Sequence, residues 1–166
     1  MPSAINFNDA LVRLSRGGID FILVGGVAAL AHGAPLHTDD LDIVYSPTPE
    51  NIDRLLDFLD SIHARYRDPA GRHIVPDAGK LADVKVNLLQ TDLGHLDLLQ
   101  SVGDGLDFQK LLRSCKEIEI AGQVVRVMDL ESLVESKRFA DRPKDRAALP
   151  VLSQLLEVVR RRGGSN

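Results

Sequence analysis

Apolar and polar residues follow one another along the chain in patterns that predict alternating helices and strands. The apolar run from Phe21 to Val24 is typical of a buried strand. The run from Asp40 to Ile43 alternates between acidic and apolar residues, which predicts a strand with one polar face. Two hairpins are expected further along, where short apolar runs flank turn residues. The predicted strands cover residues 21–24, 40–43, 84–89, 95–99, 118–120 and 124–127.

Residues that stabilise helix ends mark the limits of the predicted helices. Asn6 or Asn8 can cap the first helix, and the pair Gly17–Gly18 ends it. The segment 48–50 combines an N-cap threonine, a first-turn proline and an acid. Residues 66–80 are rich in Gly, Pro, Asp and Arg and predict a loop over or beside the site described below. Further helices are expected at 27–32, 48–62, 107–115, 130–140 and from about 143 to 156.

Composition and charge restrict the class of protein. With 166 residues, 44% of them hydrophobic and 27% charged, the chain is expected to form one soluble domain, with a core at about 8–128 and a helical segment at about 129–160. A net charge of −4 argues against general binding to DNA or RNA. Cys115 is the only cysteine, which fits a reducing compartment. No signal peptide or membrane span is visible, so we expect a cytoplasmic protein without a membrane partner.

The chemistry is expected where the first two strands meet a glycine turn. Asp40 and Asp42 are two positions apart on one strand, so their carboxylates share a face. Two carboxylates at this spacing repel each other unless a cation lies between them, and a hard divalent cation such as Mg²⁺ suits oxygen ligands. Gly25 and Gly26 permit a tight turn at a helix start, where backbone N–H groups can bind phosphate. Metal and phosphate together indicate phosphoryl chemistry on a nucleotide.

These residues resemble the signature of the DNA polymerase β-like nucleotidyltransferase superfamily. The resemblance consists of Gly25–Gly26, thirteen intervening residues, and Asp40-Leu-Asp42 with Thr38 two places before the first acid. The superfamily requires a third acid on a neighbouring strand. Asp97, which lies between two leucines in a short apolar run, meets that requirement. The implied fold is α+β, with a mixed twisted sheet flanked by helices and followed by C-terminal helices.

The chain as a whole resembles small bacterial nucleotidyltransferases of the AbiEii-related, toxin–antitoxin-associated type. The resemblance spans roughly residues 8–157 and includes the later stretches Gly94-His-Leu-Asp-Leu98, Leu133-Val-Glu-Ser-Lys137 and Arg142-Pro-Lys-Asp145. One departure is Leu36, because such proteins often have an arginine two residues before the threonine. The departure concerns one polar contact near the nucleotide and not the metal site.

The resemblance implies transfer of a nucleoside monophosphate from an NTP to a hydroxyl or phosphate acceptor. Asp40 and Asp42 would hold two Mg²⁺ ions, with Mn²⁺ as a substitute, and Asp97 would ligate metal and take the acceptor's proton. The nucleotide-binding residues would be Gly25, Gly26, Thr38 and Lys137, the last of them neutralising phosphate charge or, alternatively, lying on a solvated helix face. The acceptor could be a small molecule, an RNA end or a protein, and a helical toxin or antitoxin is a further candidate partner.

Several other polar residues are weaker candidates for a role in the site. Lys144 and Asp145 are expected to form a surface charge pair at the start of the last helix. His32 and His37 are expected to be structural or solvent-facing, whereas His95 shares a face with Asp97 and can line the pocket. All three acids are present, which favours an active enzyme. A catalytically weak or inactive nucleotide-binding regulatory module, or a partner-binding module, is the alternative.

Overall fold

The computed structural model describes residues 6–163, and its centre is a seven-stranded sheet of order β3-β4-β5-β2-β1-β9-β8. The strands are β1 (Phe21–Val24), β2 (Asp40–Tyr45), β3 (Arg65–Tyr66), β4 (Val86–Thr91), β5 (Gly94–Leu99), β8 (Lys116–Ile120) and β9 (Gln123–Val127). A separate small sheet pairs β6 (Ser101–Val102) with β7 (Leu106–Asp107). The β2–β5 and β1–β9 pairs are parallel and the others antiparallel, so the main sheet is mixed, as predicted.

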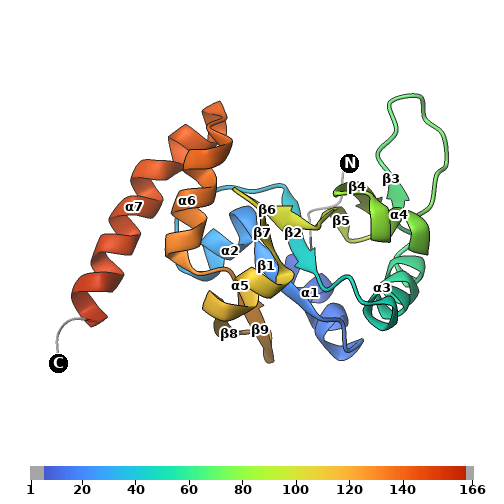
Figure 1. Ribbon diagram of the computed structural model, residues 1–166, viewed down its shortest axis with the longest axis horizontal. Helices are drawn as coiled ribbons and strands as arrows, with labels where there is room; N and C mark the ends of the chain where they lie inside the picture. Colours follow the sequence, from blue (N-terminus) through green and yellow to red (C-terminus); the bar gives the residue numbers. More distant parts are fainter. Residues whose placement is uncertain (1–5, 164–166) are drawn as a thin grey trace.

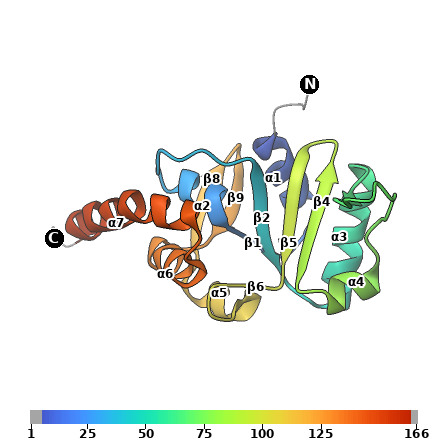
Figure 2. The ribbon, with the colours of Figure 1, turned by 90° about the horizontal axis from the view of Figure 1, so that it is seen from above.

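Helices pack around this sheet, and the two C-terminal helices lie at one end of it (Figure 1, Figure 2). They are α1 (Phe7–Arg16), α2 (Gly25–Ala31), α3 (Pro49–Ser61), α4 (Ala78–Asp83), α5 (Phe108–Ser114), α6 (Leu130–Ala140) and α7 (Pro143–Gly163). Figure 1 places α1 and α3 below the sheet, whereas α6 and the 67–77 loop rise above it on opposite sides. The upper face of β2, β5 and β4 therefore lies between two raised walls.

The buried face of the sheet is built by the apolar positions of the alternating strands. Leu41 and Ile43 of β2 and Leu96 and Leu98 of β5 are at most 3% exposed, and they face the core that α1 and α3 cover. Because successive strand residues point to opposite faces, the acids between these leucines point to the open face. The core therefore fixes which face carries the chemistry.

Helix caps follow the sequence expectations closely. The side-chain oxygen of Asn6 accepts a hydrogen bond from the backbone N–H of Asp9 at 3.0 Å, and Thr48 accepts one from Asn51 at 3.3 Å. Asp129 caps α6 by accepting from the N–H of Ser132. These caps satisfy backbone donors that a helix start leaves without partners.

The structure differs from the prediction at several element boundaries, including β4, which is Val86–Thr91 rather than 84–89, and in one small sheet. The loop expected at 66–80 contains part of β3 and of α4, because Tyr66 pairs with Leu89 across the sheet edge and Asp77 caps a short helix. Helix α2 begins at Gly25 rather than at residue 27, and α7 continues to Gly163 although Pro150 lies inside it. The small β6–β7 sheet was not predicted, because two-residue strands carry too little periodicity to recognise. Within residues 6–163, none of the helices has the length and apolar character that crossing a membrane requires.

Candidate active site

The three predicted acids lie together on the open face of the sheet. Asp42 of β2 pairs in register with Asp97 of the parallel strand β5, and Asp40 pairs with His95. Residues paired in register on adjacent strands share a face about 4.8 Å apart, so the carboxylates converge. The side chain of Asp97 is 15% exposed and that of Asp40 is 34% exposed. The prediction that Asp97 is the third acid beside Asp40 and Asp42 therefore agrees with the strand register.

Crowding and burial change the charge state of this group. Burial raises the pKa of the Asp42 carboxyl to about 8, with further contributions from the neighbouring charges of Asp97 and Asp40. Burial also raises the pKa of Asp97, although hydrogen bonding to Asp42 and the charge of Arg67 oppose the rise. Oδ1 of Asp42 is buried and has no hydrogen-bond partner among the described residues. A cation at this position would relieve both the repulsion and the unsatisfied oxygen.

Arg67 supplies a positive charge to the acids in this structure. Its guanidinium forms an ion pair with Asp97, and Nη1 lies 3.5 Å from Oδ1 of Asp40 and 3.1 Å from Nδ1 of His95. The side chain reaches the acids from the residue that follows β3, and its backbone N–H donates to the carbonyl of Leu88 on β4. The sequence does not point to this residue, because its neighbours in the sequence all predict a loop.

The glycine pair lies directly beside the acids. Gly25 has φ +68°, and a Cβ on it would collide with the carboxylate of Asp42. A Cβ on Gly26 would lie 2.7 Å from Oγ1 of Thr38, whose hydroxyl donates a hydrogen bond to the carbonyl of Asp40 at 3.2 Å. Both positions therefore need glycine so that β2 and the residues before it can approach the start of α2.

Lys137 contacts a buried carboxylate rather than the three acids. Its Nζ lies 3.1 Å from Oδ1 of Asp145, and Nε of Arg142 lies 2.6 Å from Oδ2. Asp145 is fully buried, so the expectation of a surface pair with Lys144 is wrong for this residue. Burial alone would raise the pKa of Asp145, but hydrogen bonds from Arg142 and Lys137 outweigh it and hold the pKa below its ordinary value. The cluster joins α6 to the start of α7.

Lys144, by contrast, is exposed and acts on the acids. Its charge lowers the pKa of Asp42 and so partly offsets the effect of burial. The charge of Asp42 in turn contributes to the raised pKa of Arg142, after the larger effect of Asp145. The start of α7 therefore brings positive charge toward Asp42 from the side opposite β3, a role of Lys144 that its position in the sequence does not indicate.

The histidines divide as expected. Nε2 of His32 bonds to the carbonyl of Met128 at 2.8 Å, and His37 pairs with Asp39 at 2.8 Å on the exposed surface. Nδ1 of His95 lies 3.3 Å from Oδ1 of Asp40, on the same face as the acids. Of these three histidines, His95 is the one that lies beside the acids.

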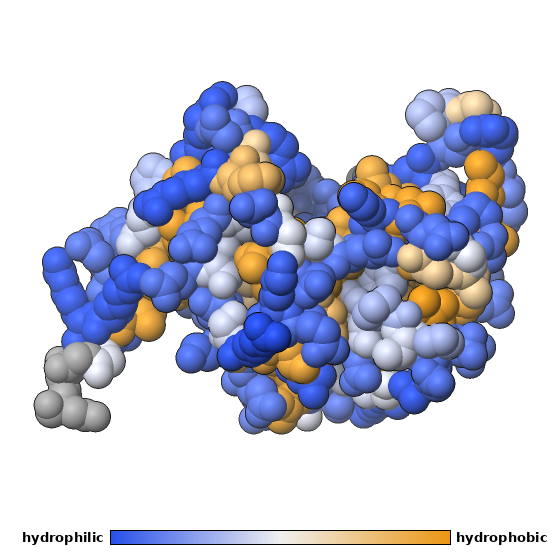
Figure 3. Space-filling view, in the orientation of Figure 1, coloured by the Kyte–Doolittle hydropathy of each residue, from blue (hydrophilic) through white to orange (hydrophobic). Residues whose placement is uncertain are grey.

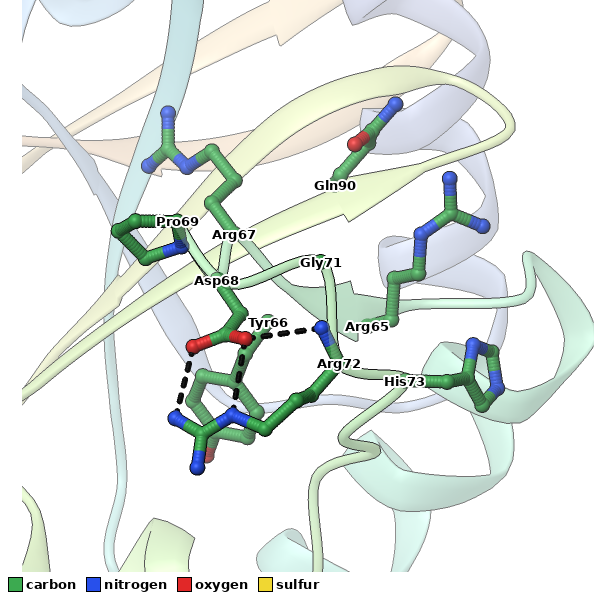
Figure 4. A pocket seen from close by; sticks show the side chains of 9 residues that line it. All are labelled: Arg65, Tyr66, Arg67, Asp68, Pro69, Gly71, Arg72, His73 and Gln90. Atoms are coloured by element: carbon green, nitrogen blue, oxygen red, sulfur yellow. Dashed lines mark hydrogen bonds and ion pairs between the residues drawn. The ribbon is translucent and has the colours of Figure 1, made fainter.

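A pocket of about 580 Å³ lies on the β3 side of the acids, and one of its lining residues is Arg67, which pairs with Asp97 and Asp40 (Figure 4). The pocket lies between the 67–77 loop and the edge of the sheet. Figure 3 shows a hollow in the molecular surface between the loop side and the α6–α7 side of the molecule. Its lining is strongly cationic: it consists of Arg65, Tyr66, Arg67, Asp68, Pro69, Gly71, Arg72, His73 and Gln90.

The donor atoms of the three acids suit a hard cation, but Arg67 occupies the position between them in this structure. Asp40, Asp42 and Asp97 offer only oxygen donors, and Oδ1 of Asp42 is unsatisfied. Among residues 6–163, however, no three acidic, histidine or cysteine side chains are already grouped as a metal site. The guanidinium of Arg67 pairs with both Asp97 and Asp40, so a metal ion would have to displace it.

Comparison with solved structures shows the fold to which this arrangement belongs. The lincosamide antibiotic adenylyltransferase LnuA, solved with lincomycin, is 14% identical with a TM-score of 0.63 over 92% of this chain and 99% of that one. ANT(2")-Ia, solved with adenylyl-2"-tobramycin, is 17% identical with a TM-score of 0.56 over 93% and 95%. A nucleotidyltransferase-like protein from Paracoccidioides brasiliensis is 18% identical with a TM-score of 0.56 over 90% and 73%.

These neighbours confirm the α+β nucleotidyltransferase fold that the sequence predicts. No curated protein matches the sequence of this chain. One family does match, and the match runs over residues 5–162, which include all three acids, the glycine pair, α6 and all of α7 except Gly163. This chain therefore belongs to the family described as "Nucleotidyl transferase of unknown function (DUF2204)".

Proposed function

We propose that this protein transfers a nucleoside monophosphate from an NTP to an acceptor hydroxyl in a Mg²⁺-dependent reaction that releases pyrophosphate. The observation that carries the proposal is the register of β2 and β5, which sets Asp42 opposite Asp97 with Asp40 on the same face. Burial and neighbouring charge raise the pKa values of Asp42 and Asp97, so the charged forms of these carboxylates are costly to keep together, and a cation-dependent reaction on phosphate explains why they are retained.

Each acid has a role in the proposed reaction. The acceptor oxygen attacks the α-phosphorus of the NTP, a new P–O bond forms, and the bond to the bridging oxygen of the β-phosphate breaks so that pyrophosphate leaves. The proton of the acceptor hydroxyl passes to Asp97, whose raised pKa suits a general base better than that of an ordinary carboxylate. Asp40 and Asp42 bind Mg²⁺, together with Asp97, and Mn²⁺ is expected to substitute. Bound Mg²⁺ would neutralise phosphate charge and lower the pKa of the acceptor hydroxyl.

The nucleotide is proposed to lie between α2 and the start of α7. The backbone N–H groups of Gly25 and Gly26 face the triphosphate, with Thr38 beside them. Lys144 supplies positive charge from the opposite wall, since its charge already acts on Asp42. The sequence leaves two roles open for Lys137, neutralising phosphate charge and lying on a solvated helix face. Because Lys137 binds Asp145, we assign it instead to holding the α6–α7 junction in place for Lys144.

Two of the structural neighbours support adenylyl transfer to a small acceptor. Their descriptions refer to an adenylylated tobramycin and to an adenylyltransferase with bound lincomycin. We therefore propose ATP as the first donor and a small molecule as the first acceptor class to test, with an RNA end or a protein as the other classes.

Calorimetric titration of each NTP, with and without Mg²⁺, tests the proposal. The wild-type protein is compared with the Asp40→Asn/Asp42→Asn double variant. We expect binding that requires both Mg²⁺ and the two acids. Absence of binding for every NTP would contradict the transferase proposal. Tight binding without turnover on any hydroxyl acceptor would favour the alternative, a regulatory nucleotide-binding module.

The AbiEii-related, toxin–antitoxin assignment is a finer proposal about biological role. It rests on the resemblance in the late run of the sequence and on a groove of about 480 Å³ between α6 and α7, which a helix of a partner protein could occupy. The test is growth of bacteria that express the wild-type chain or the double variant. Growth arrest that requires the acids would support a toxin; equal growth would contradict that role.

A further inference from the structure

The open face of the sheet carries a second row of polar residues that leads away from the acids. The strand registers pair Asp40 with His95, His95 with Gln90, and Gln90 with Arg65, across β2, β5, β4 and β3. Residues paired in this way share one face, so all four side chains stand on the same side as the acids. With strands about 4.8 Å apart, the row extends about 14 Å from Asp40 to the sheet edge.

A parallel row shows what separates the acids from that edge. Asp42, Asp97 and Leu88 follow one another across β2, β5 and β4, and the backbone N–H of Arg67 donates to the carbonyl of Leu88. Leu88 is 43% exposed, so an apolar platform lies beside Asp97, the proposed base. A molecule whose hydroxyl reaches Asp97 would rest on Leu88 and extend toward Gln90 and Arg65.

The positive charge at the β3 edge of the sheet is only partly neutralised by acidic side chains. Arg72 is neutralised by Asp68, with contacts of 2.9 to 3.0 Å, and Arg67 is directed to Asp97 and Asp40. Within residues 6–163, Arg65 has no ion-pair or hydrogen-bond partner for its guanidinium. In Figure 4, Arg65 and Gln90 extend to the same side of the loop, whereas Arg72 turns toward Asp68. A free arginine beside an amide donor is suited to bind an anion.

We infer that the acceptor of this enzyme is a small molecule that carries a phosphate group, which Arg65 and Gln90 bind while its hydroxyl faces Asp97. This inference rests on the proposed function and names the acceptor class for it. The pocket volume of about 580 Å³ is in the range of small-molecule sites, and the overall charge of −4 argues against a long nucleic acid. The phosphate would lie roughly 10 Å from the transferred hydroxyl, about two strand spacings.

The inference is tested by NMR titration of the ¹⁵N-labelled protein with pairs of compounds that differ only in a phosphate. Ribose 5-phosphate is compared with ribose, and glucose 6-phosphate with glucose. We expect the phosphorylated members to shift the signals of Arg65, Gly71, His73 and Gln90, and the neutral members to bind about tenfold more weakly or not at all. Arg65→Gln should lose the preference for the phosphate, whereas Arg16→Gln on the opposite face of the sheet should keep it.

MgATP titration of the same samples separates two kinds of failure. If MgATP does not bind the wild-type protein, the proposed function itself fails. If MgATP binds but the neutral sugars shift the pocket signals as strongly as the phosphates, or if neither phosphate shifts them, only the phosphorylated acceptor is excluded. Shifts caused by a short 5′-phosphorylated RNA but by neither sugar phosphate would overturn the small-molecule class. If Arg65→Gln also weakens MgATP binding, the pocket belongs to the nucleotide and the inference is wrong.

Discussion

The two sides of the three acids are built in different ways. On the α2 side, glycines allow the backbone to approach, and a Cβ at Gly25 would collide with the carboxylate of Asp42. On the β3 side, long cationic side chains reach across the sheet, with Arg67 passing from the sheet edge to Asp97. The first side is set by local backbone conformation and the second by pairing of distant strands. Changes on the first side should therefore act on folding and catalysis together, and changes on the second should act mainly on ligand binding.

The largest effect is expected at the centre, where both sides meet. Asp42→Asn keeps the size of the side chain but removes a charge that the proposed metal requires, so nucleotidyl transfer should fall to background. The measurement is release of pyrophosphate from MgATP with a working acceptor. The far-UV circular dichroism spectrum should not change, because the surrounding core is untouched. Retention of more than a small fraction of the activity would remove Asp42 from the proposed mechanism.

Gly25→Ala should have the next largest effect and tests the glycine side. The new Cβ would meet the Asp42 carboxylate at a residue with φ +68°. We expect loss of most activity and a decrease of about 1–3 kcal/mol in the free energy of unfolding, measured by urea denaturation. Gly122→Ala is the matched control, since φ is +80° there and a Cβ meets nothing within 4 Å. Equal effects of the two variants on activity would show that backbone strain, rather than the approach to Asp42, explains the glycine.

Comparing Lys137→Met with Lys144→Met distinguishes a role in stability from a role in nucleotide binding at the α6–α7 end of the site. The variant leaves the buried Asp145 with Arg142 as its remaining charged partner, so we expect the free energy of unfolding to fall by about 2 kcal/mol. Lys144→Met should leave thermal stability unchanged and weaken MgATP binding several-fold, because Lys144 is exposed and acts on Asp42. The opposite result, with Lys137 required for MgATP and not for stability, would restore the original prediction of a direct phosphate contact.

Arg67→Gln tests the cationic side through metal binding. In the structure the guanidinium pairs with Asp97 and Asp40, and a metal must displace it. Removing it should raise the affinity for Mg²⁺ or Mn²⁺ a few-fold, since the competing charge is gone. Calorimetric titration with Mn²⁺ in the absence of nucleotide measures the effect, with Arg16→Gln as the control. Weaker Mn²⁺ binding would mean that Arg67 orients the acids for the metal instead of competing with it.

The stability of the protein without metal should also depend on pH. The pKa of Asp42 is about 8 in the folded protein and near 3.8 in the unfolded chain, so the unfolded chain binds fewer protons between these values. The stability that this group contributes is present below about pH 4 and is lost as pH rises toward 8. Asp42→Asn should flatten this part of the profile and have the higher Tm at pH 8 in EDTA. Parallel profiles for both proteins would contradict the raised pKa.

The sequence predicted the centre of the molecule better than its edges. Asp42 and Asp97 could be paired because leucines on either side fix the face of each strand, and the glycine spacing indicates the same site. Arg67 could not be predicted, because its role depends on the pairing of the two-residue strand β3 with β4. A surface position is predicted for Asp145 because the sequence does not show that Arg142 and Lys137, three and eight residues earlier, both turn to a carboxylate that the fold buries. The single-domain boundaries and the roles of the site residues remain predictions.

The alternation of leucine and aspartate on β5 has a consequence for how the protein can misfold. A slip of β5 by one residue against β2 would turn Asp97 into the core and expose Leu96 and Leu98, which are 3% and 0% exposed in the structure. Exposing two leucines costs about 3–6 kcal/mol, before the penalty of burying a carboxylate is added. A chain that has buried its leucines has therefore also aligned its acids. The same register gives both the stable core and the arrangement of the three carboxylates.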